Sequence, residues 1–589
     1  MRSRTSLCNR ADLRVDFTRF APLWALYTVL LAALIMLFLP QNEIAYSTAS
    51  SLTGLAGLMA PVQFGYALIT AQCLFGYLYD TRLCYALHAM PQTRLCRFRT
   101  HVLAGLLFAL LPDLLGAGLC WVIAPELGTA VAWWLAAVAG QYFFFWGLAV
   151  LSVLCAGNRV GGALVYGIGN FLPLLAAWLA GSIFQPLLFG IPVPTEPFYV
   201  ACPLVRLTRE DYLTLVAPRV DAEFHRILEA VYPNEERMLY LALCCGCSLV
   251  FLLLAGRLYR KRDLEAAGEL LAVKALRPVF LLLFTLAAGA FLQLFASVFV
   301  GSSSTTYGYL LTGMVVGYFV GRMLLARQVN VFRLRAVPGI AAICAVFFAL
   351  LLLTGLDVTG IIRSLPAKDS IASVSVIPYI YENGVGVTSS DPDDIQAVLT
   401  LHQGEVDCWK SWRNANRGIS GLLTDTYQRN LRSENSDTIW LTLRYQLKNG
   451  QAVERVYQVD TNSQGGAIAA GFLRRPENVL DVKNRSELHA LGVRQVELYG
   501  DWGCGSYCTV SDITGLLNAI YDDCAAGRIL PGVYLEDTDG YLGTLSLIRQ
   551  NPEQDPERSI WLPIYDSYTS TVSYLEEHAV AFPEDGERP

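Results

Sequence analysis

The sequence predicts a polytopic α-helical membrane protein with about nine spans, an N-terminus inside, and a C-terminal soluble α+β domain outside. Two observations favour this fold class: 54% of the 589 residues are apolar and only 16% are charged, and nearly all long apolar runs lie within residues 1–356. The net charge also changes sign between residues 1–356 and residues 357–589. Residues 1–356 carry 25 Lys and Arg against 17 Asp and Glu, which leaves 19 of the 44 basic and 33 of the 50 acidic residues for 357–589. A basic membrane half and an acidic soluble half are expected to face different compartments.

The spans are read from apolar runs of about 20 residues, the length that crosses a bilayer core. The first run follows "MRSRTSLCNRADLRVDFTRF", which is too polar over too many residues for a cleavable leader, so we expect a retained span. The nine runs that qualify are 18–40, 56–79, 101–123, 130–154, 160–182, 238–256, 278–299, 306–325 and 337–356.

The orientation follows from basic residues, which are enriched in short cytoplasmic loops. Arginines precede the first span, are missing from loop 41–55, and return in loop 80–100. The alternation continues through the later loops, apart from the long and mixed segment 183–236. It predicts a multi-pass protein of the cell membrane with its N-terminus inside and residues 357–589 outside.

The second inner loop has an unusual sequence, "LYDTRLCYALHAMPQTRLCRFRTH", from Leu78 to His101. Residues on both sides of Met90 and Pro91 favour helix, whereas the proline favours a break. We expect a helix, a corner and a second helix near the membrane surface. From the residues alone, this loop is either a topological anchor or a docking element for a cytoplasmic partner.

Three patches in this sequence resemble one known family. The patches are the turn "MPQTR" with the following run "LAGLLFALLPDLLGAG", the basic segment "YRKRDLEAAGELLAVKALRPV" after the sixth span, and "LDVTGIIRSLPAKDSIASVSV" from Leu356. Together they resemble the permease subunit of type-2 ABC transporters, in a branch common in gut Firmicutes that has a C-terminal extracytoplasmic domain of unknown role.

The resemblance implies three regions and a coupling loop. Residues 1–256 would be the six-span permease core, 257–356 a basic cytoplasmic segment with three additional spans, and 357–589 the extracytoplasmic domain. In such permeases a cytoplasmic helix between the second and third spans rests in a cleft of the ATPase. The residues expected to form this ATPase-coupling loop are Arg82, Tyr85, His88, Met90, Pro91 and Arg94. In the alternative interpretation, the arginines bind lipid phosphates and the proline only turns the chain.

The expected function is that of the membrane-spanning permease subunit of an ATP-driven ABC exporter. The chain has no Gly-x-x-x-x-Gly-Lys-Ser/Thr motif, so ATP and Mg²⁺ are expected on a separate ABC ATPase subunit. This chain is expected to bind no cofactor, metal or nucleic acid and to catalyse no reaction. Its partners would be the ATPase, the lipid bilayer, and a second permease copy or a paralogue.

Two other functions stay open. One is an ABC-linked sensor or detoxification permease whose outer domain binds an antimicrobial peptide or an envelope ligand. The other is a membrane-embedded envelope-modifying enzyme, which is disfavoured because Glu43 is the only acidic residue in loop 41–55.

Asp113 is the main polar residue expected within the spans, where ionisable groups are costly and mark functional sites. It follows Pro112 in the third span. It would line the substrate path or pair with an arginine, or else serve as a structural carboxylate at a proline-broken helix. Interhelical hydrogen bonds are expected from Gln141, Asn170 and Gln185.

The C-terminal domain shows alternation of apolar and polar residues on both sides of Asn449-Gly450, which predicts a β-hairpin over 437–460. Helices are predicted for "DPDDIQAVLTLHQ" and "SDITGLLNAIYDDCAAG". The domain contains four cysteines; a bond between the second and third, or no bond, is expected in preference to a metal site. These cysteines are Cys408, Cys504, Cys508 and Cys524.

Overall fold

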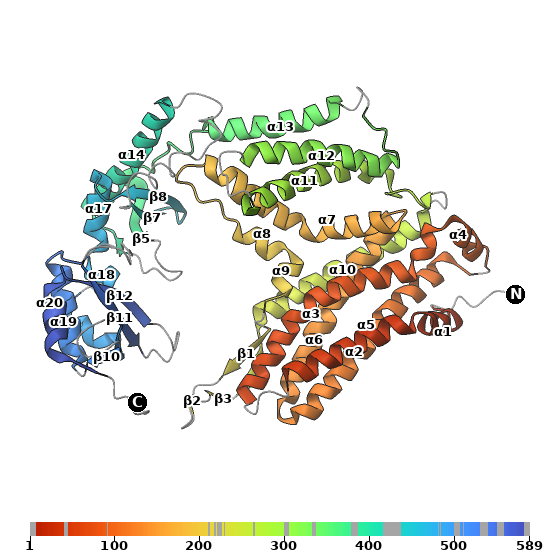
Figure 1. Ribbon diagram of the computed structural model, residues 1–589, viewed down its shortest axis with the longest axis horizontal. Coiled ribbons are helices and arrows are strands. Elements are labelled where there is room, and N and C mark those ends of the chain that lie inside the picture. Colours follow the sequence, from red (N-terminus) through yellow and green to blue (C-terminus); the bar gives the residue numbers. More distant parts are fainter. Residues whose placement is uncertain are drawn as a thin grey trace. The chain divides into compact units, whose positions relative to one another are not determined.

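The computed structural model divides the chain into two compact units (Figure 1). The helical unit comprises Met1–Gly181 and Pro194–Phe347, and the C-terminal unit comprises Ser182–Val193 and Phe348–Pro589. The residues that the structure describes are 8–39, 45–90, 92–209, 212–216, 219–220, 226–228, 230–262, 266–299, 306–332, 337–378, 387–415, 438–480, 482, 484–499, 507–510, 512–529, 540–549 and 559–581.

Nine helices among the described residues are long and apolar enough to cross a membrane. They confirm the nine predicted runs as membrane-length helices and are typical of a membrane-embedded protein. They are α2 (Ala21–Phe38), α3 (Ala45–Leu74), α5 (Arg94–Ile123), α6 (Gly128–Cys155), α7 (Arg159–Trp178, continued by a π-helical turn, Leu179–Phe184), α10 (Glu235–Lys261), α11 (Arg277–Phe299), α12 (Thr306–Ala326) and α13 (Val337–Gly355).

Two predicted boundaries were wrong. Most of the expected loop 41–55 belongs to α3, because its small residues, among them Ala49 and Thr53, are buried against neighbouring helices. The expected surface helix after Pro91 is not separate from the third span. Thr93 caps a single helix, α5, which runs without a break from Arg94 to Ile123, and the sequence offers no breaker before Pro112.

Short elements connect these helices. The excursion between α7 and α10 contains two small helices and two antiparallel strand pairs, β1 with β4 and β2 with β3. The short elements of the helical unit are α1 (Arg10–Arg19), η1 (Gly76–Tyr79), α4 (Thr81–His88), η2 (Pro125–Leu127), α8 (Glu196–Ala201), α9 (Pro203–Leu207), β1 (Leu213–Val216), β2 (Arg219–Val220), β3 (Arg226–Ile227), β4 (Ala230–Pro233) and η6 (Lys274–Leu276).

Helix α6 is the most buried of the nine and packs against α3, α5 and α10. Small residues allow the backbones to approach closely, as is common between helices in membranes. A Cβ atom added to Gly147 would lie 2.2 Å from the Ser248 hydroxyl of α10, and one added to Gly105 of α5 would lie 2.1 Å from the Trp146 ring. Helices α11 and α12 meet in the same way, with Gly317 against Ala288.

The first half of the C-terminal unit is a four-stranded antiparallel sheet in the order β6-β5-β7-β8, packed against α14 and α17. The predicted hairpin is confirmed: β7 and β8 pair from Thr438 with Asp460, and Gly450 in the turn has φ +84°. The predicted helix at Asp391 is also confirmed as α14. The elements are η8 (Lys368–Ser370), β5 (Ile371–Pro378), β6 (Val387–Ser389), α14 (Pro392–Ala415), β7 (Thr438–Leu447), β8 (Ala452–Asp460), α17 (Gln464–Leu473) and α18 (Pro476–Val479).

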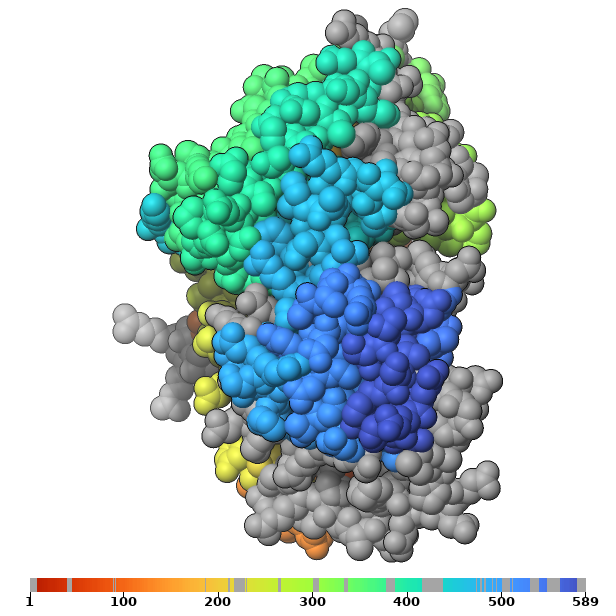
Figure 2. Space-filling model, turned by 90° about the vertical axis from the view of Figure 1, so that its left-hand side faces the viewer, coloured from red at the N-terminus to blue at the C-terminus, as the bar shows by residue number. Residues whose placement is uncertain are grey.

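The second half is a five-stranded antiparallel sheet in the order β12-β11-β9-β10-β13, with α19 and α20 packed against it. Figure 2 shows the surface that this half of the unit presents on one face, in blue to dark blue. The predicted helix at Ser511 is confirmed as α19, which Asp512 caps. The elements are η9 (Arg485–Leu491), β9 (Val493–Tyr499), β10 (Tyr507–Val510), α19 (Ile513–Ala525), β11 (Tyr541–Arg549), β12 (Ser559–Tyr565), α20 (Thr569–His578) and β13 (Ala579–Ala581).

Candidate functional site

The predicted coupling loop forms an elbow, Gly76–Arg97, which leads from α3 into the first turn of α5. Its central helix α4 (Thr81–His88) is capped by Asp80, whose carboxylate accepts hydrogen bonds from the backbone N–H groups of Arg82 (2.8 Å) and Leu83 (3.2 Å). Thr93 then caps α5 by accepting from the N–H of Cys96 at 3.3 Å. Side-chain capping at both helix starts fixes where each helix begins. The elbow therefore consists of a short helix, a corner and the start of a long helix.

Arginines tie the elbow to the end of α10. The Arg94 guanidinium donates to the carbonyl oxygens of Arg260 and Arg262, both at 3.2 Å. Arg262 is itself buried and donates to the carbonyl oxygens of Leu154 (2.6 Å) and Leu78. Arg97 donates to the carbonyl of Leu87, which closes the corner. Neither Arg97 nor Arg262 was among the six residues expected to form the coupling loop.

The elbow carries exposed apolar side chains. Leu83 is 48%, Tyr85 50% and Met90 50% exposed, and Arg82 is exposed beside them. The six residues expected to form the coupling loop therefore differ in whether a partner could reach them. Arg82, Tyr85 and Met90 are accessible to a partner, while Arg94 holds the elbow to the rest of the chain. Pro91 and the side chain of His88 lie outside the described residues.

A second group of polar residues lies between the apolar helices. Asp113 of α5 is fully buried and accepts a hydrogen bond from the Tyr27 hydroxyl of α2 at 2.9 Å. The Gln63 amide of α3 donates to the same hydroxyl at 3.2 Å. Within the described residues no arginine contacts Asp113. We call Tyr27, Gln63, Tyr66 and Asp113 the Tyr27 cluster.

Pro112 explains why Tyr66 belongs to this cluster. A proline has no N–H, so the carbonyl four residues earlier in a helix loses its usual donor. That carbonyl is Phe108 O, and the Tyr66 hydroxyl donates to it at 3.0 Å. The ring of Tyr66 is then stacked on Tyr27, with centroids 4.3 Å apart. A broken backbone hydrogen bond thus positions an aromatic pair beside the buried carboxyl group.

The three residues expected to form interhelical hydrogen bonds, Gln141, Asn170 and Gln185, differ in their partners. Gln141 does bond between elements, donating to Ala56 O (3.1 Å) and to the Tyr212 hydroxyl (2.7 Å). Gln185 instead closes its own loop, since it donates to Ile191 O and accepts from Val193 N–H. The buried amide of Asn170 has no partner in the described part of the chain.

The sequence pattern also missed a connection inside the C-terminal unit, where residues Ser182–Val193 form what we call the anchor segment. The Phe189 ring is stacked on Trp409 of α14, with centroids 5.9 Å apart. The carbonyl of Gly190 accepts from the N–H of Val456 in edge strand β8 at 2.9 Å. This segment continues the chain directly from α7, so the end of an apolar helix leads into the core of the C-terminal unit.

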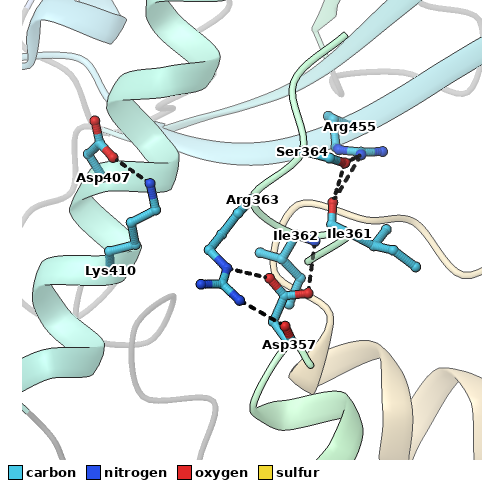
Figure 3. A network of polar contacts seen from close by, with 8 residues as sticks. All are labelled: Asp357, Ile361, Ile362, Arg363, Ser364, Asp407, Lys410 and Arg455. Atoms are coloured by element: carbon cyan, nitrogen blue, oxygen red, sulfur yellow. Dashed lines mark hydrogen bonds and ion pairs between the residues drawn. The ribbon is translucent and has the colours of Figure 1, made fainter. Parts of the chain in front are cut away.

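The segment that follows α13 attaches to the same strand (Figure 3). Asp357 accepts from the Ile362 N–H at 3.1 Å and from the Arg363 guanidinium at 2.9 Å, which closes a turn after the helix. Arg455 of β8 reaches the carbonyl of Ile361 at 3.4 Å. Strand β8 therefore holds two segments that lead out of apolar helices.

Two titratable side chains lie buried on α14. Burial raises the pKa of Glu405 to about 7, and the negative charge of Asp460 adds to this effect. Burial lowers the pKa of His402 to about 4, and the positive charge of Arg455 adds to it. The His402 ring is 3.0 Å from the Tyr445 hydroxyl. Both groups are therefore neutral at mildly acidic pH.

These two shifts predict opposite pH effects on the stability of the C-terminal unit. Glu405 binds its proton more tightly when folded, so it costs stability as pH rises from 4.5 to about 7. His402 binds its proton less tightly when folded, so it costs stability as pH falls from 6.5 to about 4. The two effects nearly cancel in the wild type between these limits.

Glu405→Gln should therefore make stability rise with pH from about 4 to 6.5, and add about 3 kcal/mol above pH 7. Hydrogen exchange of the α14 amides in the full chain measures this. Glu576→Gln, at an exposed position of α20, serves as the control and should leave the wild-type pH profile unchanged. The same profile in Glu405→Gln as in the wild type would show the interpretation to be wrong.

The four cysteines of this unit stay only partly described. Cys524 is a buried free thiol and Cys408 lies exposed on α14, while Cys504 and the side chain of Cys508 lie outside the described residues. Within the described ranges, no three His, Cys, Asp or Glu side chains are grouped so as to hold a metal ion.

No protein-family model, no curated protein and no solved structure matches this chain.

Proposed function

We propose that the chain is the membrane-spanning permease subunit of an ATP-driven exporter, powered by a separate ABC ATPase that carries ATP and Mg²⁺. The elbow is the observation that carries this proposal. Leu83 and Tyr85 stay about half exposed on a short capped helix, and Met90, just after it, is equally exposed. Full burial of such side chains is worth about 1.5–3 kcal/mol each, so a partner protein that covers them gains a substantial part of its binding energy.

The attachment of the elbow suits the transmission of force. A motor can move membrane helices only through a stiff element that contacts both. The elbow continues into α5 without a break at Arg94, and Arg94 bonds the end of α10. A displacement of α4 would therefore reach two of the apolar helices. Arginines that only bound lipid phosphates would not need these internal partners.

The topology belongs to the same proposal. The alternation of basic loops places the N-terminus and the elbow in the cytoplasm and the C-terminal unit outside the cell membrane. The permease would act with a second copy of itself or with a paralogue. Its energy would come from nucleotide hydrolysis on the partner ATPase.

The anchor segment favours a sensing role as the second candidate. Because Phe189 and Gly190 hold the continuation of α7 in the core of the C-terminal unit, a peptide or envelope ligand bound to that unit would act on the end of α7. An ABC-linked sensor or detoxification permease would use such a connection.

The test is purification of the tagged full chain from its native membranes in mild detergent. We expect a protein with a P-loop to co-purify in a fixed ratio, and the complex to hydrolyse ATP. A chain that is isolated without any P-loop protein, under conditions in which its oligomers persist, would contradict the proposal.

A further inference from the structure

We propose that the Tyr27 cluster binds an organic ammonium group, which makes amines the cargo class of the transporter. The inference rests on the proposed transport function and deepens it. It starts from two buried acceptor atoms in the described part of the chain that have no hydrogen-bond partner, Asp113 Oδ2 and Gln63 Oε1. Both side chains are fully buried. Buried polar groups are normally hydrogen-bonded, so each such atom calls for an explanation.

The two acceptors belong to neighbouring side chains. Asp113 Oδ1 and Gln63 Nε2 both bond the Tyr27 hydroxyl oxygen, at 2.9 and 3.2 Å. The Tyr27 hydroxyl donates its proton to Asp113 Oδ1 and accepts from Gln63 Nε2. It therefore has no second proton to donate to Asp113 Oδ2 or Gln63 Oε1. The atoms of these three side chains that have no hydrogen-bond partner at all are one carboxyl oxygen and one amide oxygen, which are acceptors when the carboxyl group is ionised. A ligand group that fits them donates hydrogen bonds.

The charge of the cluster selects a cation. A cation within about 4–6 Å of a buried carboxyl group stabilises its ionised form, which burial alone disfavours, whereas an anion would be repelled. An alkylammonium group supplies up to three donors and one positive charge. A divalent metal ion would require more oxygen ligands than one carboxylate and one amide provide.

Aromatic rings beside the carboxyl group favour an organic cation over an inorganic one. Tyr27 and Tyr66 are stacked with an angle of 12° between their rings, and the Tyr142 ring lies 5.9 Å from Tyr66. Tyrosine faces attract ammonium groups and contact their alkyl substituents, as in the aromatic cages that bind quaternary ammonium ligands.

Two prolines offer a route for the ligand. Pro61 lies inside α3 two residues before Gln63, and Pro112 lies inside α5 directly before Asp113. Helices bend most readily at proline, where a backbone hydrogen bond is missing. Bending at these positions would separate α2, α3 and α5 at the cluster and admit the amine.

The experiment uses the full chain in lipid nanodiscs, with n-dodecylammonium as the probe and n-dodecanol as its uncharged counterpart of equal chain length. We expect the amine, and not the alcohol, to raise the unfolding temperature in a saturable way. Asp113→Asn should weaken the apparent affinity at least tenfold, and Gln63→Met should weaken it several-fold. Glu126→Gln, which removes an exposed carboxylate, should bind like the wild type.

Equal stabilisation by the alcohol, or wild-type affinity in Asp113→Asn, would overturn the proposal. Stabilisation by Na⁺ that depends on Asp113, without an effect of the amine, would also overturn it in favour of an inorganic cation. If Asp113→Asn does not fold, Asp113→Glu and Gln63→Met decide between these outcomes. Co-purification of the ATPase with Gln63→Met separates failure here from failure of the proposed function, because Gln63 is fully buried and is not one of the exposed elbow residues that would contact the ATPase.

Discussion

Replacing Leu83 with Glu and Tyr85 with Ala should abolish co-purification of the ATPase while leaving the protein folded and inserted. Both side chains are about half exposed on α4 and neither is among the core residues of the helical unit, so their loss costs the isolated chain little. A partner that buries them would lose about 3 kcal/mol or more of binding free energy, which is at least a hundredfold in affinity. Quantitative pull-down of the tagged chain measures the loss.

Two control variants sharpen this test. Val329→Glu alters an exposed apolar residue (78%) in another loop that the charge pattern places inside, and should leave the complex intact. Arg94→Met removes the bonds to Arg260 and Arg262; it should retain the ATPase but uncouple ATP hydrolysis from transport. Wild-type recovery of the ATPase with the double variant would show that the elbow does not bind it.

Replacing Gly190 with Ala should release the anchor segment. Gly190 has φ +70°, where a side chain costs about 1–2 kcal/mol. Its Cβ atom would also lie 2.3 Å from the Tyr457 ring, and such overpacking costs about 1–3 kcal/mol. The two penalties together, about 3 kcal/mol, are comparable with what holds the segment, namely the hydrogen bond from Val456, about 0.5–1.5 kcal/mol, and the burial of Phe189, about 1.5–3 kcal/mol.

Hydrogen exchange over 182–193 and β8 measures this release. We expect exchange there to become at least tenfold faster, with the amides of α19 unaffected. Gly167→Ala is the matched control, since its Cβ would contact nothing within 4 Å and the residue lies in α7. Unchanged protection of β8 in Gly190→Ala would mean that the anchor segment does not depend on this contact.

The sequence patterns located those helices and strands that can be recognised from residues close together in the sequence. Apolar runs found the nine long helices because a helix that can cross a bilayer is recognised by its length and composition alone, and alternation with Asn449-Gly450 found the β7–β8 hairpin. The start of α5 was missed because an apolar window does not register the basic first turns after the Thr93 cap.

Contacts between distant residues were not predictable in this way. The partners of Arg94 are carbonyl groups at the end of α10, which any residue type supplies. Phe189 reads as an ordinary apolar residue, and only the folded unit brings it to Trp409. Asp113 was identified from its cost in an apolar run, whereas its partner Tyr27 looked like any interfacial aromatic residue of the first span.

The most direct test of the account is photo-crosslinking from the elbow itself. A photoreactive phenylalanine at position 85 should crosslink to a protein with a P-loop in native membranes, and the yield should change between ATP and ADP. Crosslinks to lipid alone, or reaction of position 85 with a reagent confined to the outside of the cell, would contradict the account.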